Sequence, residues 1–135
     1  KEVILKSNFL SSIFFFVNLN LNQLNSVILI DNKYVYPSEI EKCLIQHESI
    51  AEVVAFGINV SDHEQEVCVW IRLDESGGEA LMTVNDVVCY CQSRLDEYKI
   101  PKYIKFVSSY PIKRGKYLRH EMQRQEKLEL LLNNH

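Results

Sequence analysis

Two apolar runs rich in β-branched residues, at residues 52–58 and 67–73, constrain the fold of this chain most strongly. Their sequences, EVVAFGI and VCVWIRL, each have the length and composition of a buried strand. The polar connection between them, residues 59–65, is short, so the two strands are expected to pair antiparallel. With 135 residues and 47% hydrophobic side chains, the chain can form one packed domain around this pair.

Short predicted strands and helices alternate along the rest of the chain. Further strands are expected at residues 27–30, 33–36 and 103–107, and helices after residue 37, after residue 83 and over residues 118–132. Asp31 and Asn32, residue types that favour tight turns, separate the first two strands. This order predicts a small two-layer α+β domain, in which helices flank a central, mainly antiparallel sheet of about three strands and a hairpin precedes them.

Capping signals mark the start of two of the expected helices. Ser38 with Glu41, and Thr83 with Asp86, have the spacing of a capping box, in which each side chain satisfies an unpaired backbone N–H group. The apolar residues of the second helix recur at helical spacing and are expected to face the sheet: Val84, Val87, Val88, Cys91 and Leu95.

Composition argues against several classes of site and partner. A net charge of -3 disfavours nucleic acid as the main partner, because phosphate contacts need a basic surface. The four cysteines form no CxxC pair and no zinc-binding spacing, so they are expected to be reduced thiols, with no metal site. Asparagines interrupt the apolar N-terminal residues too often for a membrane span.

The N-terminal residues differ in composition from the rest of the chain. No charged side chain occurs between Ser7 and Ile30. Three interpretations stay open for this stretch. It can be a divergent hairpin from the end of a preceding domain, a disordered or aggregation-prone tail, or sequence foreign to the domain. We therefore divide the chain into residues 1–26, a divergent or non-native segment, and residues 27–135, the expected folded domain.

The segment Pro-Ile-Lys-Arg-Gly-Lys at residues 111–116 has the features of a site that acts on charged groups. Gly115 gives the backbone freedom, and Lys116 adds a long cationic arm that can reach a carboxylate or a phosphate. There the ammonium would offset the charge that builds up during phosphoryl transfer. The spacing is not that of a P-loop, and taken alone the segment is more typical of a solvated basic turn.

Several separated segments resemble the C-terminal domain of adenylate-forming enzymes, which include acyl-CoA synthetases, luciferases and the adenylation domains of peptide synthetases. Residues 36–41 (YPSEIE) resemble the family's N-I-Y-P-x-E-I-E, residues 52–67 its E-x-x-V-x-G-x-x-D-x-x-x-G-E, residues 98–107 its Y-K-x-P-x-x-I-x-F-V, and residues 110–116 its L-P-x-T-x-x-G-K. Order and spacing agree from Val27 to Met122, and residues 98–107 look most like the medium-chain fatty acid type.

The resemblance implies a mobile lid that works with a large N-terminal domain, which binds ATP, Mg²⁺ and a carboxylic acid. Lys116 is the implied catalytic residue, because it would bridge the acyl carboxylate and the AMP phosphate while acyl-adenylate forms. The lid then turns about a hinge, implied at Asn25, and presents its other face to CoA.

The resemblance also implies residues that face CoA or ATP, namely Asp31, Asn32, Lys33, Tyr34, His63, Ile100, Pro101 and Lys102. Tyr34 occupies a position on the ATP side, and His63 stands where the family often has arginine. Asp31 and Asn32 replace a Gly-Gly pair, so their side chains are expected to narrow the CoA tunnel and to add a negative charge.

These implications predict part of an ATP-dependent acid–thiol ligase, a fatty acid–CoA ligase, that is inactive without its ATP-binding domain. The expected partners are that domain, in the same or a split enzyme, together with CoA and the fatty acyl-adenylate. An intracellular and, from the medium-chain type, mitochondrial location is expected. Two alternatives stay open: a non-catalytic interaction or pseudoenzyme module derived from the lid, and an unrelated α+β ligand-binding domain of ferredoxin-like plan.

Overall fold

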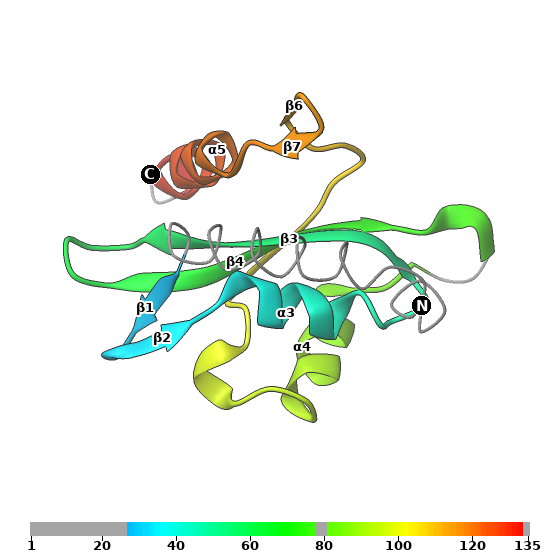
Figure 1. Ribbon diagram of the computed structural model, residues 1–135, viewed down its shortest axis with the longest axis horizontal. Helices are drawn as coiled ribbons and strands as arrows, with labels where there is room; N and C mark the ends of the chain where they lie inside the picture. The colour runs from blue at the N-terminus through cyan, green and yellow to red at the C-terminus, as the bar shows by residue number, and fades with distance from the viewer. Residues whose placement is uncertain (1–26, 78–80, 134–135) are drawn as a thin grey trace, which may run out of the picture.

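A three-stranded sheet forms the centre of the computed structural model, which describes residues 27–77 and 81–133 (Figure 1). Its strands are β3 (Ile50–Asn59), β4 (Gln65–Leu73) and β5 (Tyr103–Phe106), in the order β3-β4-β5. As predicted, β3 and β4 pair antiparallel. Strand β5 joins the other edge of β4 in parallel, after a connection that contains a helix. The expected α+β class is confirmed.

Both faces of this sheet are buried, which explains why β3 and β4 are continuous apolar runs in the sequence. Successive residues point to opposite faces of a strand. Val53 and Ala55 of β3 belong to one hydrophobic cluster, and Val54 and Phe56 belong to a second. The sheet therefore separates two cores, one on each face.

Helices cover the two faces of the sheet. The first face carries α3 (Pro37–Leu44) and α4 (Val84–Gln92), whereas α5 (Arg119–Asn133) lies on the opposite face (Figure 1). The predicted two-layer arrangement is thus extended by a further layer, which α5 provides. Two short 3-10 helices, η1 (Glu75–Gly77) and η2 (Glu97–Lys99), lie in the connections.

The predicted N-terminal hairpin is present as β1 (Ile28–Ile30) and β2 (Lys33–Val35). Its turn residues Asp31 and Asn32 have φ values of 48° and 64°. Positive φ at both positions is the geometry of the two-residue turns that match the twist of a hairpin, and Asn and Asp tolerate it better than most residues.

A second hairpin, β6 (Ile112–Lys113) with β7 (Lys116–Tyr117), occupies the segment for which the sequence indicated only a loop. Arg114 and Gly115 form its turn with φ values of 54° and 76°. Strands this short show no alternation of apolar and polar residues, so no local pattern predicts them.

The two capping predictions have opposite outcomes. The box at Thr83 is confirmed: Thr83 Oγ1 accepts a hydrogen bond from Asp86 N at 3.2 Å, and Asp86 Oδ2 accepts one from Thr83 N at 2.8 Å. The box at Ser38 is wrong, because α3 begins at Pro37 and its N-cap residue, Tyr36, makes no side-chain cap. The Glu41 carboxylate instead accepts hydrogen bonds from residues outside α3.

The predicted apolar face of α4 is confirmed only in part. Val87 and Cys91 are fully buried, but the Val84 side chain is 48% exposed. The helix ends at Gln92, so Leu95 lies beyond it. Such a short helix contacts the sheet through its middle, and its first residue points toward solvent.

The remaining expectations concern the cysteine thiols, membrane-spanning helices, metal ligands and the N-terminal segment. Cys43, Cys68, Cys89 and Cys91 are free thiols. Among the described helices, none has the length and apolarity that crossing a membrane requires. Residues 27–77 and 81–133 hold no cluster of three or more His, Cys, Asp or Glu side chains suited to a metal ion. The expected hinge at Asn25 and the segment 1–26 lie outside the described residues.

Candidate functional site

The β6–β7 hairpin presents three cationic side chains at its end. Lys116 is the first residue of β7 and pairs with Lys113 of β6, and Arg114 lies in the turn between them. All three residues are exposed. No carboxylate in the described part of the chain forms an ion pair or hydrogen bond with these side chains. The Lys116 ammonium is therefore available to bind an external carboxylate or phosphate.

A partly buried ion pair fixes the start of α5, three residues after Lys116. Glu41 Oε1 accepts hydrogen bonds from Arg119 Nη2 at 3.0 Å and from Ala55 N at 3.3 Å. Burial raises the pKa of Glu41, although the Arg119 guanidinium acts in the opposite direction. The contact joins α3, β3 and α5, and it keeps the chain that follows the hairpin at a fixed place on the domain.

A groove of about 680 Å³ lies at the turn of the N-terminal hairpin. Most of the residues that the resemblance assigns to CoA or ATP line it, namely Asp31, Asn32, Lys33, His63, Ile100 and Lys102. They come from three separate segments: the β1–β2 hairpin, the β3–β4 turn and the strip that follows η2. The volume falls within the range of small-molecule sites, roughly 300–1,000 Å³.

Two predicted residues do not line this groove. The Tyr34 side chain is 63% exposed on β2 and stands apart from the lining. Pro101 is buried between two residues that do line it, Ile100 and Lys102. Pro101 thus adjoins the groove in sequence but does not line it.

The two lysines of the groove already have partners inside the domain. Lys102 Nζ lies 3.2 Å from Glu66 Oε1, and this hydrogen bond raises the pKa of Lys102. Lys33 Nζ lies 4.6 Å from the centre of the Tyr98 ring, a cation–π contact. The lining also contains four carboxylates, those of Asp31, Glu64, Glu66 and Glu97. The groove therefore has more carboxylates than ammonium groups, which suits an uncharged chain better than a phosphate.

Sequence reasoning missed Gln65 and Glu66 as groove residues. Gln65 Oε1 accepts a hydrogen bond from Leu29 N at 2.8 Å, and its Nε2 donates to Asn59 Oδ1 at 3.0 Å, so Gln65 joins the first hairpin to the β3–β4 turn. A signal for Gln65 was present, because it occupies the Glu position of the family's G-E pair.

The hairpin with Lys116 and the groove lie on opposite faces of the sheet. Tyr117, next to Lys116, packs against the cluster that contains Trp70 and Met122. Ile30 and Ile100 of the groove pack against the cluster on the other face. Figure 1 shows the same separation, with β6–β7 on the side of α5 and β1–β2 on the side of α3.

Comparison with known proteins gives a consistent result. The family described as "AMP-binding enzyme C-terminal domain" matches residues 39–116. The medium-chain acyl-CoA ligase ACSF2 of Danio rerio, described as mitochondrial, is 34% identical over 80% of this chain. A 2-succinylbenzoate–CoA ligase from Geobacillus sp. is 32% identical over 84% of the chain.

A solved structure, the fatty acyl CoA synthetase of Mycobacterium tuberculosis, superposes on 76% of the chain with a TM-score of 0.66 and 27% identity. The chain spans only 18% of the Danio rerio ligase, 22% of the Geobacillus ligase and 20% of the solved synthetase chain. The similarity is therefore to one part of each of these proteins.

Proposed function

This chain belongs to the family of AMP-binding enzyme C-terminal domains, and we propose that it acts as the lid of a fatty acid–CoA ligase. The observation that carries this proposal is that Lys116, exposed and without an ion-pair partner among the described residues, lies on the opposite face of the domain from the groove. Two faces suit two successive half-reactions, because a lid that turns can present each face in its own step.

In the first half-reaction, Lys116 is the catalytic residue. A carboxylate oxygen of the fatty acid attacks the α-phosphorus of ATP, the bond to pyrophosphate breaks, and acyl-adenylate forms. The Lys116 ammonium donates hydrogen bonds to the acyl carboxylate and the α-phosphate, and so offsets their negative charge. ATP, Mg²⁺ and the acid are bound by an ATP-binding domain outside these 135 residues, in the same or a separate polypeptide.

In the second half-reaction, the groove receives CoA. The CoA sulfur attacks the acyl carbon, the bond to AMP breaks, and the thioester and AMP leave. The groove between Asp31, His63 and Lys102 would hold the uncharged pantetheine arm, since its carboxylates disfavour the phosphates. Asn25 would serve as the hinge, Tyr34 would face ATP, and the medium-chain relatives support a mitochondrial location.

A second candidate function is a non-catalytic binding module. The acidic lining of the groove favours it, because CoA carries several phosphates. Such a module would dock on a partner by the same surfaces but without any need for the Lys116 ammonium.

Complementation separates the two candidates. The full chain is added to the Danio rerio ligase truncated before its C-terminal domain, with ATP and a medium-chain fatty acid, and pyrophosphate release is measured. If the chain acts as the lid, we expect it to stimulate pyrophosphate release. Lys116→Ala should reduce this stimulation by roughly a hundredfold, as does the loss of other preorganised hydrogen-bond donors. Lys113→Ala, a cation lost from the same hairpin, is the matched control and should retain most of the stimulation.

Two results would contradict the lid. One is an absence of stimulation by a chain that binds the truncated ligase, and the other is equal stimulation by the wild-type chain and Lys116→Ala. Binding to the truncated ligase that is unchanged by Lys116→Ala and accelerates neither half-reaction would establish the non-catalytic binding module instead.

A further inference from the structure

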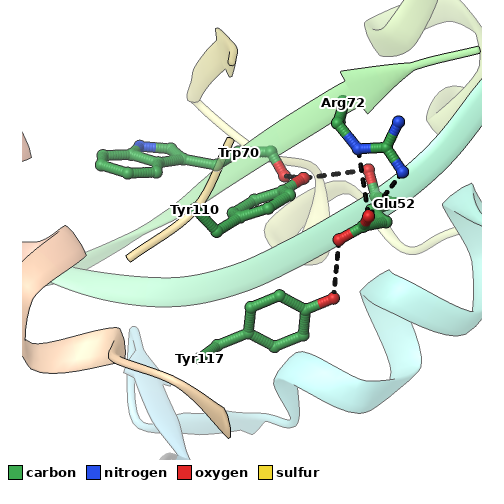
Figure 2. Close-up of polar contacts among 5 residues, drawn as sticks. All are labelled: Glu52, Trp70, Arg72, Tyr110 and Tyr117. Atoms are coloured by element: carbon green, nitrogen blue, oxygen red, sulfur yellow. Dashed lines mark hydrogen bonds and ion pairs between the residues drawn. The ribbon is translucent and has the colours of Figure 1, made fainter. Parts of the chain in front are cut away.

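We propose that Glu52 is a positioning residue for Lys116, because it holds both ends of the hairpin that carries the lysine. The catalytic consequence rests on the proposed lid function, whereas the structural claim can be tested on this chain alone. Glu52 lies in β3, far in sequence from Lys116, and the contacts between them run through Tyr110 and Tyr117 (Figure 2).

The carboxylate of Glu52 holds the C-terminal end of the hairpin. Its Oε2 accepts a hydrogen bond from the Tyr117 hydroxyl at 2.9 Å, and its Oε1 accepts one from Arg72 Nε at 3.0 Å. Each carboxylate oxygen thus has its own donor, and Arg72 on the neighbouring strand fixes the direction in which the carboxylate points (Figure 2).

The backbone of Glu52 holds the N-terminal end. The Tyr110 hydroxyl lies 3.0 Å from the Glu52 backbone oxygen and 2.9 Å from that of Trp70, and it donates its one proton between them. Tyr110 is 9% exposed and directly precedes Pro111, at the start of the hairpin segment. Its hydroxyl is therefore fixed between β3 and β4.

The two tyrosines also hold each other. Their rings meet edge to face, with centres 5.2 Å apart and planes at 67°. At the base of the hairpin, Leu118 N donates a hydrogen bond to Pro111 O at 2.8 Å. The hairpin, its base and both tyrosines consequently form one unit. Both tyrosine hydroxyls contact Glu52, and Tyr110 also donates to the backbone oxygen of Trp70.

The hairpin needs such external support. Strands of two residues cannot make a hairpin stable by themselves, because few hydrogen bonds oppose the loss of conformational entropy. The orientation of the Lys116 side chain relative to the sheet therefore depends on the two tyrosine contacts. A lysine displaced by about 1 Å would lose much of its effect on a transition state.

Residue-resolved amide hydrogen exchange on the full chain tests the inference directly. The Leu118 amide reports on the base of the hairpin, and the Val107 amide, bonded to Ile71 O at 2.9 Å, reports on the sheet. Tyr117→Phe removes only the hydroxyl, and we expect the Leu118 amide to exchange roughly tenfold faster, with Val107 unchanged.

Four variants separate positioning from general support of the fold. Tyr103→Phe, in the same core on β5, is the matched control and should leave Leu118 exchange within about twofold. Arg72→Met removes the ion pair but keeps the Glu52–Tyr117 bond, so its effect on Leu118 should be smaller than that of Tyr117→Phe. Glu52→Gln, whose amide oxygen still accepts from Tyr117, should protect Leu118 better than Glu52→Ala.

The inference is overturned if Tyr117→Phe leaves Leu118 exchange unchanged, or if it accelerates Leu118 and Val107 equally. In the complementation assay, Tyr117→Phe should lower the maximal rate of adenylate formation several-fold without changing the amount of chain that gives half-maximal stimulation. If the wild-type chain gives no stimulation, the lid function fails, and the exchange rates still decide the role of Glu52.

Discussion

The indole Nε1 of Trp70 donates a hydrogen bond to Glu126 Oε2 at 3.0 Å, which joins the middle strand of the sheet to α5. Glu126 is only 7% exposed, and the other buried residue of α5 is Met122. Lys105 Nζ lies 4.8 Å from the centre of the Trp70 ring, on the same face. A helix that buries so few side chains depends strongly on each of these contacts.

Loss of this bond should weaken the attachment of α5. Glu126→Ala leaves the buried indole N–H group without an acceptor, and we expect the free energy of unfolding to fall by about 2 kcal/mol. Glu126→Gln keeps an acceptor oxygen and should cost less. Because Trp70 is the single tryptophan of the chain, its fluorescence during urea unfolding measures both effects.

Glu129→Ala provides the comparison on the same helix. Glu129 pairs with Lys105, but its side chain is 50% exposed, so this loss should cost under about 1 kcal/mol. Equal destabilisation by the Glu126 and Glu129 variants would contradict the importance assigned to the buried bond.

The capping box of α4 leads to a second stability prediction. Thr83→Ala removes the acceptor for the Asp86 amide and the hydroxyl that Asp86 binds, and should lower the free energy of unfolding by about 1 kcal/mol. Thr83→Ser keeps the hydroxyl and should recover most of that loss in the same urea titration. A serine variant no more stable than the alanine variant would show that the methyl group, and not the cap, stabilises this position.

The acidic groove leads to a prediction about CoA, on the premise of the proposed lid. Replacing both Asp31 and Asn32 by glycine removes a carboxylate and two side chains from the groove, and glycine adopts positive φ freely. In the complemented enzyme, we expect the KM for CoA to fall about threefold at low salt, with a smaller change at high salt because exposed charges are screened.

Asp62→Asn is the control for the groove variant. It removes one carboxylate from the exposed β3–β4 turn at a position that does not line the groove. A comparable fall in the KM for CoA with Asp62→Asn would mean that net charge, and not the groove, governs the effect.

Local signals in the sequence predicted most of the framework. The apolar runs of β3 and β4, the Asp31–Asn32 turn and the cap at Thr83 depend on neighbouring residues, so pattern and residue type are sufficient to find them. The residues assigned to CoA were identified by the family's motifs, and most of them line the groove, but their role stays a prediction. The order of segments, however, did not show that α5 covers the second face.

Contacts between distant segments could not be predicted in the same way. Glu41 was assigned to a local cap with Ser38, but its carboxylate binds Arg119, 78 positions later. Glu52 and Tyr117 are separated by 65 positions. The packing of α5 and the hairpin on the sheet decides which of these distant side chains meet. A single sequence contains no periodic pattern that predicts this packing.

The Glu52 contacts should depend on pH in a defined direction. Hydrogen bonds from Arg72 and Tyr117 lower the pKa of Glu52 below its ordinary value, so its ionised form stabilises the fold above the unfolded-state pKa, about 4.3. That contribution is lost as pH falls through the lower pKa of the folded state. We therefore expect wild type to be more stable than Glu52→Gln at pH 7, and the difference to shrink as pH falls below about 4.3. Urea titrations of both chains measure it, since the other carboxylates titrate alike in each. A difference independent of pH would contradict a role for the ionised carboxylate.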